Sequence, residues 1–162
     1  MNKPQTLPAS LPADFDLASA EWMLLRGGSE FDYPIDYAYA VASADPAKGR
    51  IELLVRWEPD AYCHYHRHLG TTTATVLAGE QHIIEERPHE TVHKLRKAGF
   101  QGPVADGDVH MEHAGPEGLT MLFSVHAPDG RLFDLLDGDG NTLLEVTIAD
   151  VVERRLGEPA AA

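Results

Sequence analysis

The 162-residue sequence is poor in cysteine and in basic side chains, and it has no long apolar run. Its single cysteine, Cys63, cannot form an internal disulfide, which favours a reducing compartment. Lysine and arginine total 13 against 26 aspartate and glutamate residues, and the formal net charge of -13 repels phosphate backbones. No stretch approaches the ~20 apolar residues that span a bilayer. Nucleic acid and membrane are therefore not expected partners.

The chain length and the first residues narrow the class further. A chain of 162 residues can bury one hydrophobic core and is short for two domains. Hydrophobic residues make up 43% of the chain, which is typical of a globular protein. Residues 1–5 lack the apolar core of a secretory signal. We therefore expect a single cytoplasmic domain.

Short β-type segments separated by Gly, Pro and Asp clusters follow one another through most of the chain. The first two, 37–42 and 51–57, flank the turn residues 45–49 and predict a hairpin. The other expected strands are 71–77, 81–86, 91–97, 119–126, 131–136 and 142–146. Many short strands with such turns indicate an antiparallel sandwich or barrel.

The two ends of the chain carry different signals. Thr147 with Asp150 resembles a helix capping box, although Asp replaces the usual Glu or Gln. The expected helix runs to Leu156, and Gly157 can end it. Residues 14–26 leave two readings open, a short helix capped by an aspartate or a strand at 22–25.

Histidines are the most informative residues, because three of the nine stand at alternate positions within six residues. Alternate side chains of a strand share a face, so His64, His66 and His68 are expected on one face with Cys63 on the other. Two imidazoles on one face can bind a common ion, at about 2.0–2.1 Å for zinc. His110, which follows a turn into a strand, is a candidate third ligand. A His-x-His pair alone also fits a solvated strand face.

The spacing around these histidines resembles the two sequence motifs of the cupin family. The first motif, G-x5-H-x-H-x3-4-E-x6-G, matches in spacing at Asp60, His66, His68, Thr72 and Gly79. The second motif, G-x5-P-x-G-x2-H-x3-N, matches in spacing at Gly99, Ala105, Gly107, His110 and Ala114. The residue type departs from the motif at Asp60, Thr72, Ala105 and Ala114. The first departure is mild, because Asp tolerates the left-handed backbone conformation better than most residues.

The resemblance implies the fold and the division of the chain. It implies an all-β, single-domain cupin, which is a double-stranded β-helix or jelly-roll barrel, with a short C-terminal helix. The parts that we expect are a flexible N-terminal arm at 1–13, the cupin β-barrel at 14–147, and the short helix with a loose tail at 148–162. By similarity to other small cupins, the chain is expected to form a homodimer.

The same resemblance implies a metal site and an activity. Thr72 stands where most metal cupins have a glutamate ligand, so the implied ligands are three neutral imidazoles, His66, His68 and His110. This set is similar to that of the three-histidine cupin dioxygenases, such as acetylacetone dioxygenase and dihydroxyacetophenone dioxygenase. It implies a mononuclear non-haem iron dioxygenase that acts on a small diketone- or hydroxyketone-like substrate. The implied cofactor is a divalent metal ion, Fe(II) first, with Zn(II) or Ni(II) as alternatives.

Several alternatives stay open on the sequence. The chain could be a metal- or ligand-binding regulatory cupin without turnover, or a structural cupin whose histidines bind metal only adventitiously. His64 could be a metal ligand in place of one of the others, a residue of the pocket, or a residue of its rim. Glu112 shares strand parity with His110 and could accept an imidazole N–H, but we expect a surface carboxylate. The sequence assigns no catalytic residue beyond the metal ligands.

Overall fold

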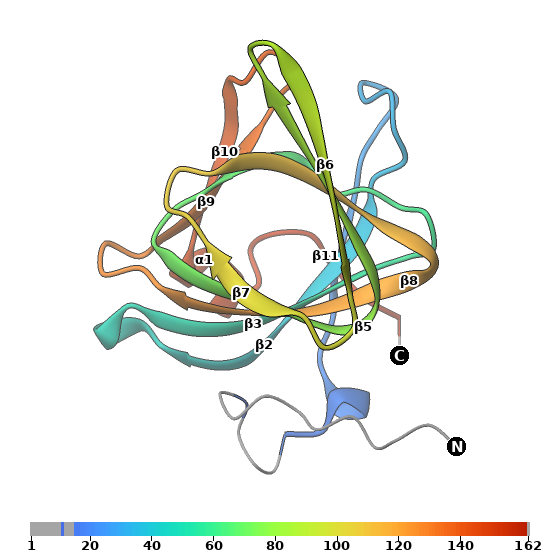
Figure 1. Ribbon diagram of the computed structural model, residues 1–162. Coiled ribbons are helices and arrows are strands. Elements are labelled where there is room, and N and C mark those ends of the chain that lie inside the picture. Colours follow the sequence, from blue (N-terminus) through green and yellow to red (C-terminus); the bar gives the residue numbers. More distant parts are fainter. Residues whose placement is uncertain (1–10, 12–14, 162) are drawn as a thin grey trace.

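The structure, a computed structural model, describes residue 11 and residues 15–161. In this part of the chain one sheet curls around the middle of the molecule (Figure 1). Its strands are β1 (Met23–Arg26), β2 (Asp36–Asp45), β3 (Arg50–Trp57), β4 (Tyr65–His68), β5 (Thr71–Arg87), β6 (Glu90–Lys97), β7 (Gln101–Val104), β8 (Val109–His126), β9 (Arg131–Leu136), β10 (Thr142–Thr147) and β11 (Glu158–Pro159). The helical segments are two 3-10 turns, η1 (Leu17–Ser19) and η2 (Pro46–Lys48), and the helix α1 (Ile148–Val152). The prediction of an all-β barrel with a short C-terminal helix is confirmed.

Strand β8 holds the barrel together, because it pairs with strands on both of its edges. Its second half lies between β3 and the first half of β5, and its first half pairs with β4 and with the second half of β5. Around the sheet the order is β10-β9-β4-β8-β3-β2-β1-β11, and β5 also pairs with β6 and β7. All of these strand pairs are antiparallel, as the turn-rich sequence predicted.

Two predicted strands join into one. The expected segments 71–77 and 81–86 form the single strand β5, which bends through register shifts against β8. Gly79 lies in this bend with a φ of 79°, and a Cβ there would collide with the backbone carbonyl of Gly118. Asp60, which replaces the first motif glycine, has a φ of 59°. The motif positions for glycine are therefore left-handed turns, and Asp60 adopts one as expected.

The two ends of the described chain settle the open readings. Asp16 caps the 3-10 turn η1, and residues 23–26 form strand β1. The segment therefore contains both a short capped helical turn and a strand. The capping box of Thr147 and Asp150 is present, but α1 ends at Val152 and not at Leu156. The helix stops early because Arg154 has a left-handed φ of 57°, after which the chain returns to the sheet as β11 against β1. Apart from Leu11, the expected N-terminal arm lies outside the described residues.

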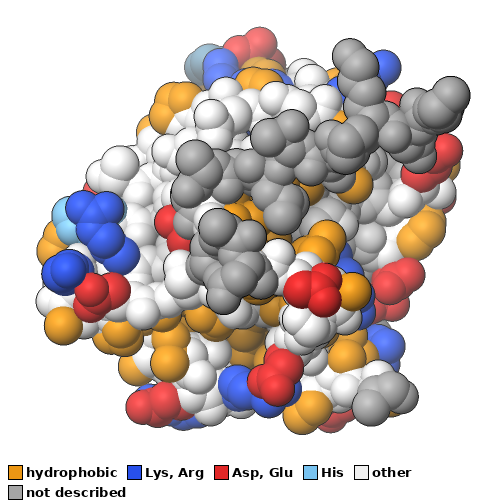
Figure 2. All heavy atoms as spheres, turned by 90° about the horizontal axis from the view of Figure 1, so that it is seen from below, with side chains coloured by type: hydrophobic (Ala, Val, Ile, Leu, Met, Phe, Trp, Pro, Cys, Tyr) orange, Lys and Arg blue, Asp and Glu red, His pale blue; other side chains and the backbone are white. Residues whose placement is uncertain are grey.

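Apolar side chains pack on both faces of the curled sheet. The larger cluster fills the barrel and includes Leu53, Val55 and Phe123. A smaller cluster on the sheet contains Leu54 and Leu122, and its other members are Leu11, Ala40 and Leu77, with Phe15, Ala20, Trp22 and Ala42 packed against it. Apolar side chains also gather on the face drawn in Figure 2. Within the described residues, no helix is long and apolar enough to cross a membrane.

Candidate metal centre

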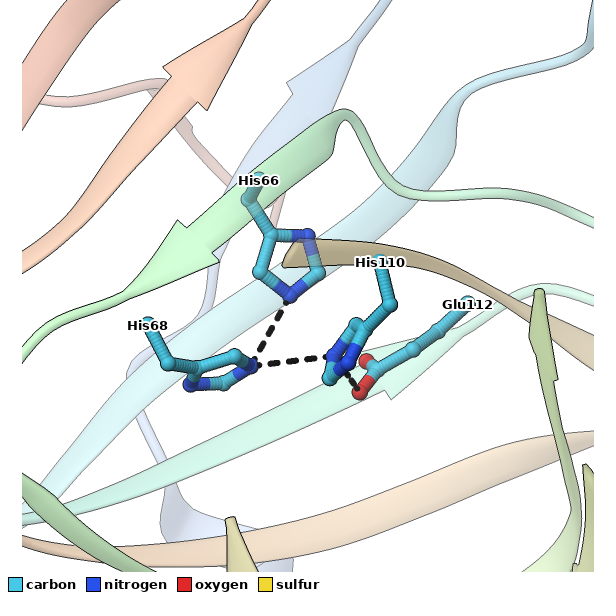
Figure 3. A group of neighbouring side chains, drawn as sticks. All are labelled: His66, His68, His110 and Glu112. Carbon is cyan, nitrogen blue, oxygen red and sulfur yellow. Dashed lines mark hydrogen bonds and ion pairs between the residues drawn. The ribbon is translucent and has the colours of Figure 1, made fainter. Parts of the chain in front are cut away.

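Strands β4 and β8 bring the three predicted histidines together inside the barrel. His66 and His68 are buried on the inner face of β4, while Tyr65 and Arg67 between them are partly exposed. The antiparallel register places His66 directly opposite His110 on β8. The three imidazoles therefore converge from two neighbouring strands, as Figure 3 shows.

The spacing of the imidazole nitrogens fits one bound ion. His66 Nε2 is 3.0 Å from His68 Nε2, which is 3.1 Å from His110 Nε2. Two ligand atoms about 2.1 Å from one ion are about 3.0 Å apart at a right angle and about 3.4 Å apart at a tetrahedral angle. The observed separations fit adjacent positions of an octahedron. Such an arrangement leaves room for further ligands on the same ion.

Glu112 adds a carboxylate to this group. It stands two residues after His110 on β8 and is 2% exposed. Its Oε1 lies 2.9 Å from His110 Nε2, and the Gln81 side-chain amide donates a hydrogen bond of 3.0 Å to the same oxygen. His66, His68, His110 and Glu112 each offer one ligand atom, and these four atoms all lie within 4.8 Å of one another. The group could therefore bind a metal ion.

Our expectation that Glu112 is a surface carboxylate is wrong. Its strand parity with His110 was the available signal, since residues two apart on a strand share a face. That signal does not show which face is buried at this point, because the curl of the whole sheet decides which face of β8 lies inside. Only the tertiary structure therefore shows that the Glu112 side chain is buried.

Backbone and side-chain acceptors fix two of the imidazoles. His66 Nδ1 lies 2.7 Å from the His64 carbonyl oxygen, and His110 Nδ1 lies 3.0 Å from Asp108 Oδ2. Each acceptor requires a hydrogen on Nδ1, which leaves the Nε2 lone pair directed at the cluster in the neutral ring. This is how metal-binding histidines are commonly held in one tautomer and orientation.

The charges within the cluster favour a cation. Burial and the neighbouring His110 lower the pKa of His66 to about 4, and burial lowers the pKa of His68 well below its usual value. Burial also disfavours a charged His110, but hydrogen bonds with Asp108 and Glu112 raise its pKa to about 9. Against the opposing effect of burial, the hydrogen bond with His110 lowers the pKa of Glu112 to about 2. Without a metal ion, one proton on His110 thus balances the Glu112 carboxylate.

His64 lies outside this group. Its Nδ1 is 2.8 Å from the Tyr37 hydroxyl, and its ring contacts Phe31 edge-on. The expectation that His64 shares a face with His66 and His68 is wrong, because β4 begins only at Tyr65 and residues 63–64 precede the regular pleat. For the same reason Cys63 does not point away, and its sulfur lies 3.7 Å from His66 Nδ1.

Two cavities approach the cluster from different sides. An interior cavity of about 60 Å³ touches His66, His68 and Glu112. Its other lining residues are Tyr37, Leu53, Val55, Trp57, Cys63, Thr72, Phe123, Val125, Leu132, Phe133 and Leu135. A polar cavity of about 240 Å³ touches His110 and Asp108. The cluster therefore separates an apolar chamber from a charged one.

Thr72 lies where the motif predicts a residue of the site. It is 2% exposed and lines the interior cavity with the histidines. Its hydroxyl oxygen is buried and has no hydrogen-bond partner. The carboxylate that the first motif would place at this position comes instead from Glu112 on another strand.

Known structures resemble most of this chain in fold, although no protein-family model matches the sequence and no curated protein matches it. An RmlC-like cupin from Ralstonia eutropha JMP134 has a TM-score of 0.64 at 16% identity, over 86% of this chain and 81% of that one. An acetylacetone dioxygenase from Acinetobacter johnsonii has a TM-score of 0.64 at 12% identity, over 94% of both chains. A cupin 2 conserved barrel domain protein from Rhodopseudomonas palustris has a TM-score of 0.60 at 17% identity, over 75% of this chain and 81% of that one. The chain therefore has the cupin fold, with a buried group of three histidines and one glutamate that could hold a metal ion.

Proposed function

We propose that this cupin binds one divalent metal ion through His66, His68, His110 and Glu112. We further propose that it is a mononuclear iron dioxygenase for a small diketone- or hydroxyketone-like substrate. The observation that carries the proposal is the set of separations of 2.9–3.1 Å between neighbouring ligand atoms in the cluster. On an octahedral ion, four such ligands would leave two positions for substrate and dioxygen.

The chain's own residues would prepare this site in three ways. The His64 carbonyl and Asp108 hold two imidazoles in the orientation that a metal needs. Glu112 brings one negative charge, so the site differs from the three neutral imidazoles that the sequence implied. The apolar walls of the interior cavity would limit the access of bulk water to a bound ligand. Bound Fe(II) would supply Lewis acidity and electron transfer to dioxygen.

The similarity to an acetylacetone dioxygenase supports the reaction class by analogy of fold alone, since the identity is 12%. The experiment that tests the proposal is elemental analysis of protein purified without a histidine tag, followed by anaerobic loading with Fe(II) and measurement of oxygen uptake. A panel of diketones and hydroxyketones serves as substrates. About one iron per chain together with oxygen uptake supports the proposal, whereas iron-loaded protein that consumes no oxygen with any of them contradicts the dioxygenase.

A regulatory cupin without turnover is the second candidate, and one observation favours it. Four protein ligands are the number found in closed structural zinc sites, which keep no position for a substrate. Stoichiometric zinc in the purified protein, with no oxygen uptake after iron loading, would support this function. The homodimer and the cytoplasmic location stay predictions, and size-exclusion chromatography with light scattering tests the first of them.

A further inference from the structure

The polar cavity beside His110 gathers basic side chains in a chain that is otherwise acidic. Its volume is about 240 Å³, and its wall comes from β5, β6, β7, the start of β8 and the turn before it. Three of the 13 lysine and arginine residues line it, together with two carboxylates. The basic residues are Arg87, Lys94 and Arg96, and the carboxylates are Glu85 and Asp108. Even with a neutral His110, the wall therefore carries more positive than negative charge.

Both carboxylates of this wall already have partners. Lys94 Nζ lies 2.5 Å from Glu85 Oε1, and an Arg87 guanidinium nitrogen lies 2.8 Å from Glu85 Oε2. Asp108 Oδ2 accepts the Nδ1 hydrogen of His110 at 3.0 Å. The ligand atoms of Glu85, Asp108 and His110 lie within 4.8 Å of one another, but a cation there would have to displace the two basic side chains. The wall is therefore not arranged for a metal ion.

Arg96 is the charged group of this wall that lacks a counter-ion. Within the part of the chain that the structure describes, its guanidinium has no hydrogen bond and no ion pair. It lies over the Phe100 ring, 4.3 Å from the ring centroid, and it shares a face of β6 with Lys94. Because the guanidinium is planar, stacking on a ring leaves its in-plane N–H donors available for an anion.

We propose that this cavity binds a short aliphatic monocarboxylate through Arg96. The planar fork of a guanidinium matches the two oxygens of a carboxylate, and one negative charge balances the one unpaired positive charge. Ile83 and Val104, which are 2% and 8% exposed, supply an apolar wall for the hydrocarbon part of the ligand. Pro103 and Ala105 extend this wall. A dianion such as phosphate would bring a second negative charge that meets no further unpaired cation.

Butyrate is the probe, and butyramide is its uncharged match. The protein is used as purified and is titrated by calorimetry at constant ionic strength, with sodium chloride exchanged for sodium butyrate. We expect one butyrate per chain with a dissociation constant below about 10 mM, and no measurable binding of butyramide. Inorganic phosphate should bind more weakly than butyrate. The proposal is overturned if butyrate shows no saturable binding, or if butyramide or phosphate binds as tightly as butyrate.

Variants of one arginine locate the binding site. Arg96→Gln should weaken butyrate binding at least about 10-fold, because it removes the charged fork. Arg56→Gln is the matched control, since Arg56 also stacks on a ring, that of Trp22 at 4.3 Å, but lines neither cavity. Arg96→Lys keeps the charge and loses the fork, so its affinity should fall between those of the wild type and Arg96→Gln.

Circular dichroism verifies that these variants fold. Unchanged binding in folded Arg96→Gln, or an equal loss in Arg56→Gln, would contradict the site. If Arg96→Gln does not fold, Arg96→Lys decides, and it must bind butyrate more weakly than the wild type.

The test also separates this cavity from the metal centre. A carboxylate that binds to a metal ion at the histidine cluster would lose affinity in His66→Ala and keep it in Arg96→Gln. Butyrate in the polar cavity should show the reverse pattern, because His66 does not line that cavity. The reverse pattern supports the proposal and the first pattern overturns it. Neither outcome depends on the proposed dioxygenase activity.

Discussion

Glu112 Oε1 lies 2.9 Å from His110 Nε2, and the two residues stand two apart on the inner face of β8. This relationship gives the candidate site a carboxylate at a place other than the one that the first cupin motif specifies. Gln81, on the neighbouring strand β5, holds the same carboxylate with its side-chain amide. The departure at Thr72 therefore does not leave the site without an acidic group.

The histidine assignment predicts a simple loss of metal. His66→Ala and His110→Ala should each abolish stoichiometric metal binding, because each removes one of the converging nitrogens. The matched control is His89→Ala, since His89 is exposed in the turn between β5 and β6. Elemental analysis of the three variants after metal loading and dialysis decides the matter. Metal retained at one ion per chain in either of the first two variants would rule out this ligand set.

If Glu112 is a metal ligand, a glutamate introduced at position 72 on β5 should be able to replace its carboxylate. Glu112→Gln should weaken metal binding at least about 100-fold, because it removes a charged ligand and keeps the volume. The Glu117→Gln control should have no effect, since Glu117 is exposed on the same strand. Adding Thr72→Glu to the Glu112→Gln variant should restore affinity, because Thr72 lines the same cavity. Competition with a chelator measures all three, and an affinity unchanged in Glu112→Gln would show that Glu112 is not a ligand.

Asp108 is predicted to act through His110. Its carboxylate accepts the Nδ1 hydrogen of His110 at 3.0 Å, which fixes the tautomer that presents Nε2 to the metal. Asp108→Asn should lower metal affinity about 10- to 100-fold, the usual effect of losing such a partner. Asp106→Asn, an exposed change in the same turn, provides the control. Equal affinities of the two variants would mean that Asp108 does not orient the imidazole.

The buried histidines predict how the metal-free protein responds to acid. The pKa of His66 is about 4 in the folded chain and about 6.5 when unfolded, so the unfolded chain takes up the proton first. The stability that the neutral imidazole contributes is complete above about pH 6.5 and is lost as the pH falls toward 4, by roughly 3 kcal/mol. Urea unfolding with a chelator present, from pH 7 to pH 4, measures this loss. A His66→Asn variant should show a shallower pH dependence, and an equal slope in both proteins would contradict the assignment.

His110 predicts the opposite behaviour at alkaline pH. Its pKa of about 9 in the folded chain lies above the unfolded value of about 6.5, because Asp108 and Glu112 stabilise the imidazolium against the cost of burial. Its stabilising effect is therefore complete below about pH 6.5 and is lost as the pH rises through 9. The same unfolding experiment, continued to pH 9.5, should show stability falling on this side as well, whereas a flat alkaline limb would contradict the charge pairing.

The spacing of motif residues predicted more of this site than the residue types did. His66, His68 and His110 could be chosen from the sequence, because a two-residue step along a strand holds side chains on one face. The same rule failed at His64, since the step applies only within a strand and β4 begins at Tyr65. The rule also could not show that Glu112 belongs to the site, because strand parity alone does not show whether a face lies inside or outside the barrel.

The sequence by itself determined most of the strands, many of the turns and the three histidines of the candidate site, since alternation, glycine positions and motif spacing are local properties of the chain. Only the tertiary structure decided which side chains meet. The pairing of β4 with β8 places His66 opposite His110, and the pairing of β5 with β8 brings Gln81 into contact with Glu112. These contacts join residues more than 25 positions apart, and their register depends on how the whole sheet curls. The apolar walls of the interior cavity come from several strands at once, so the cavity exists only in the folded barrel.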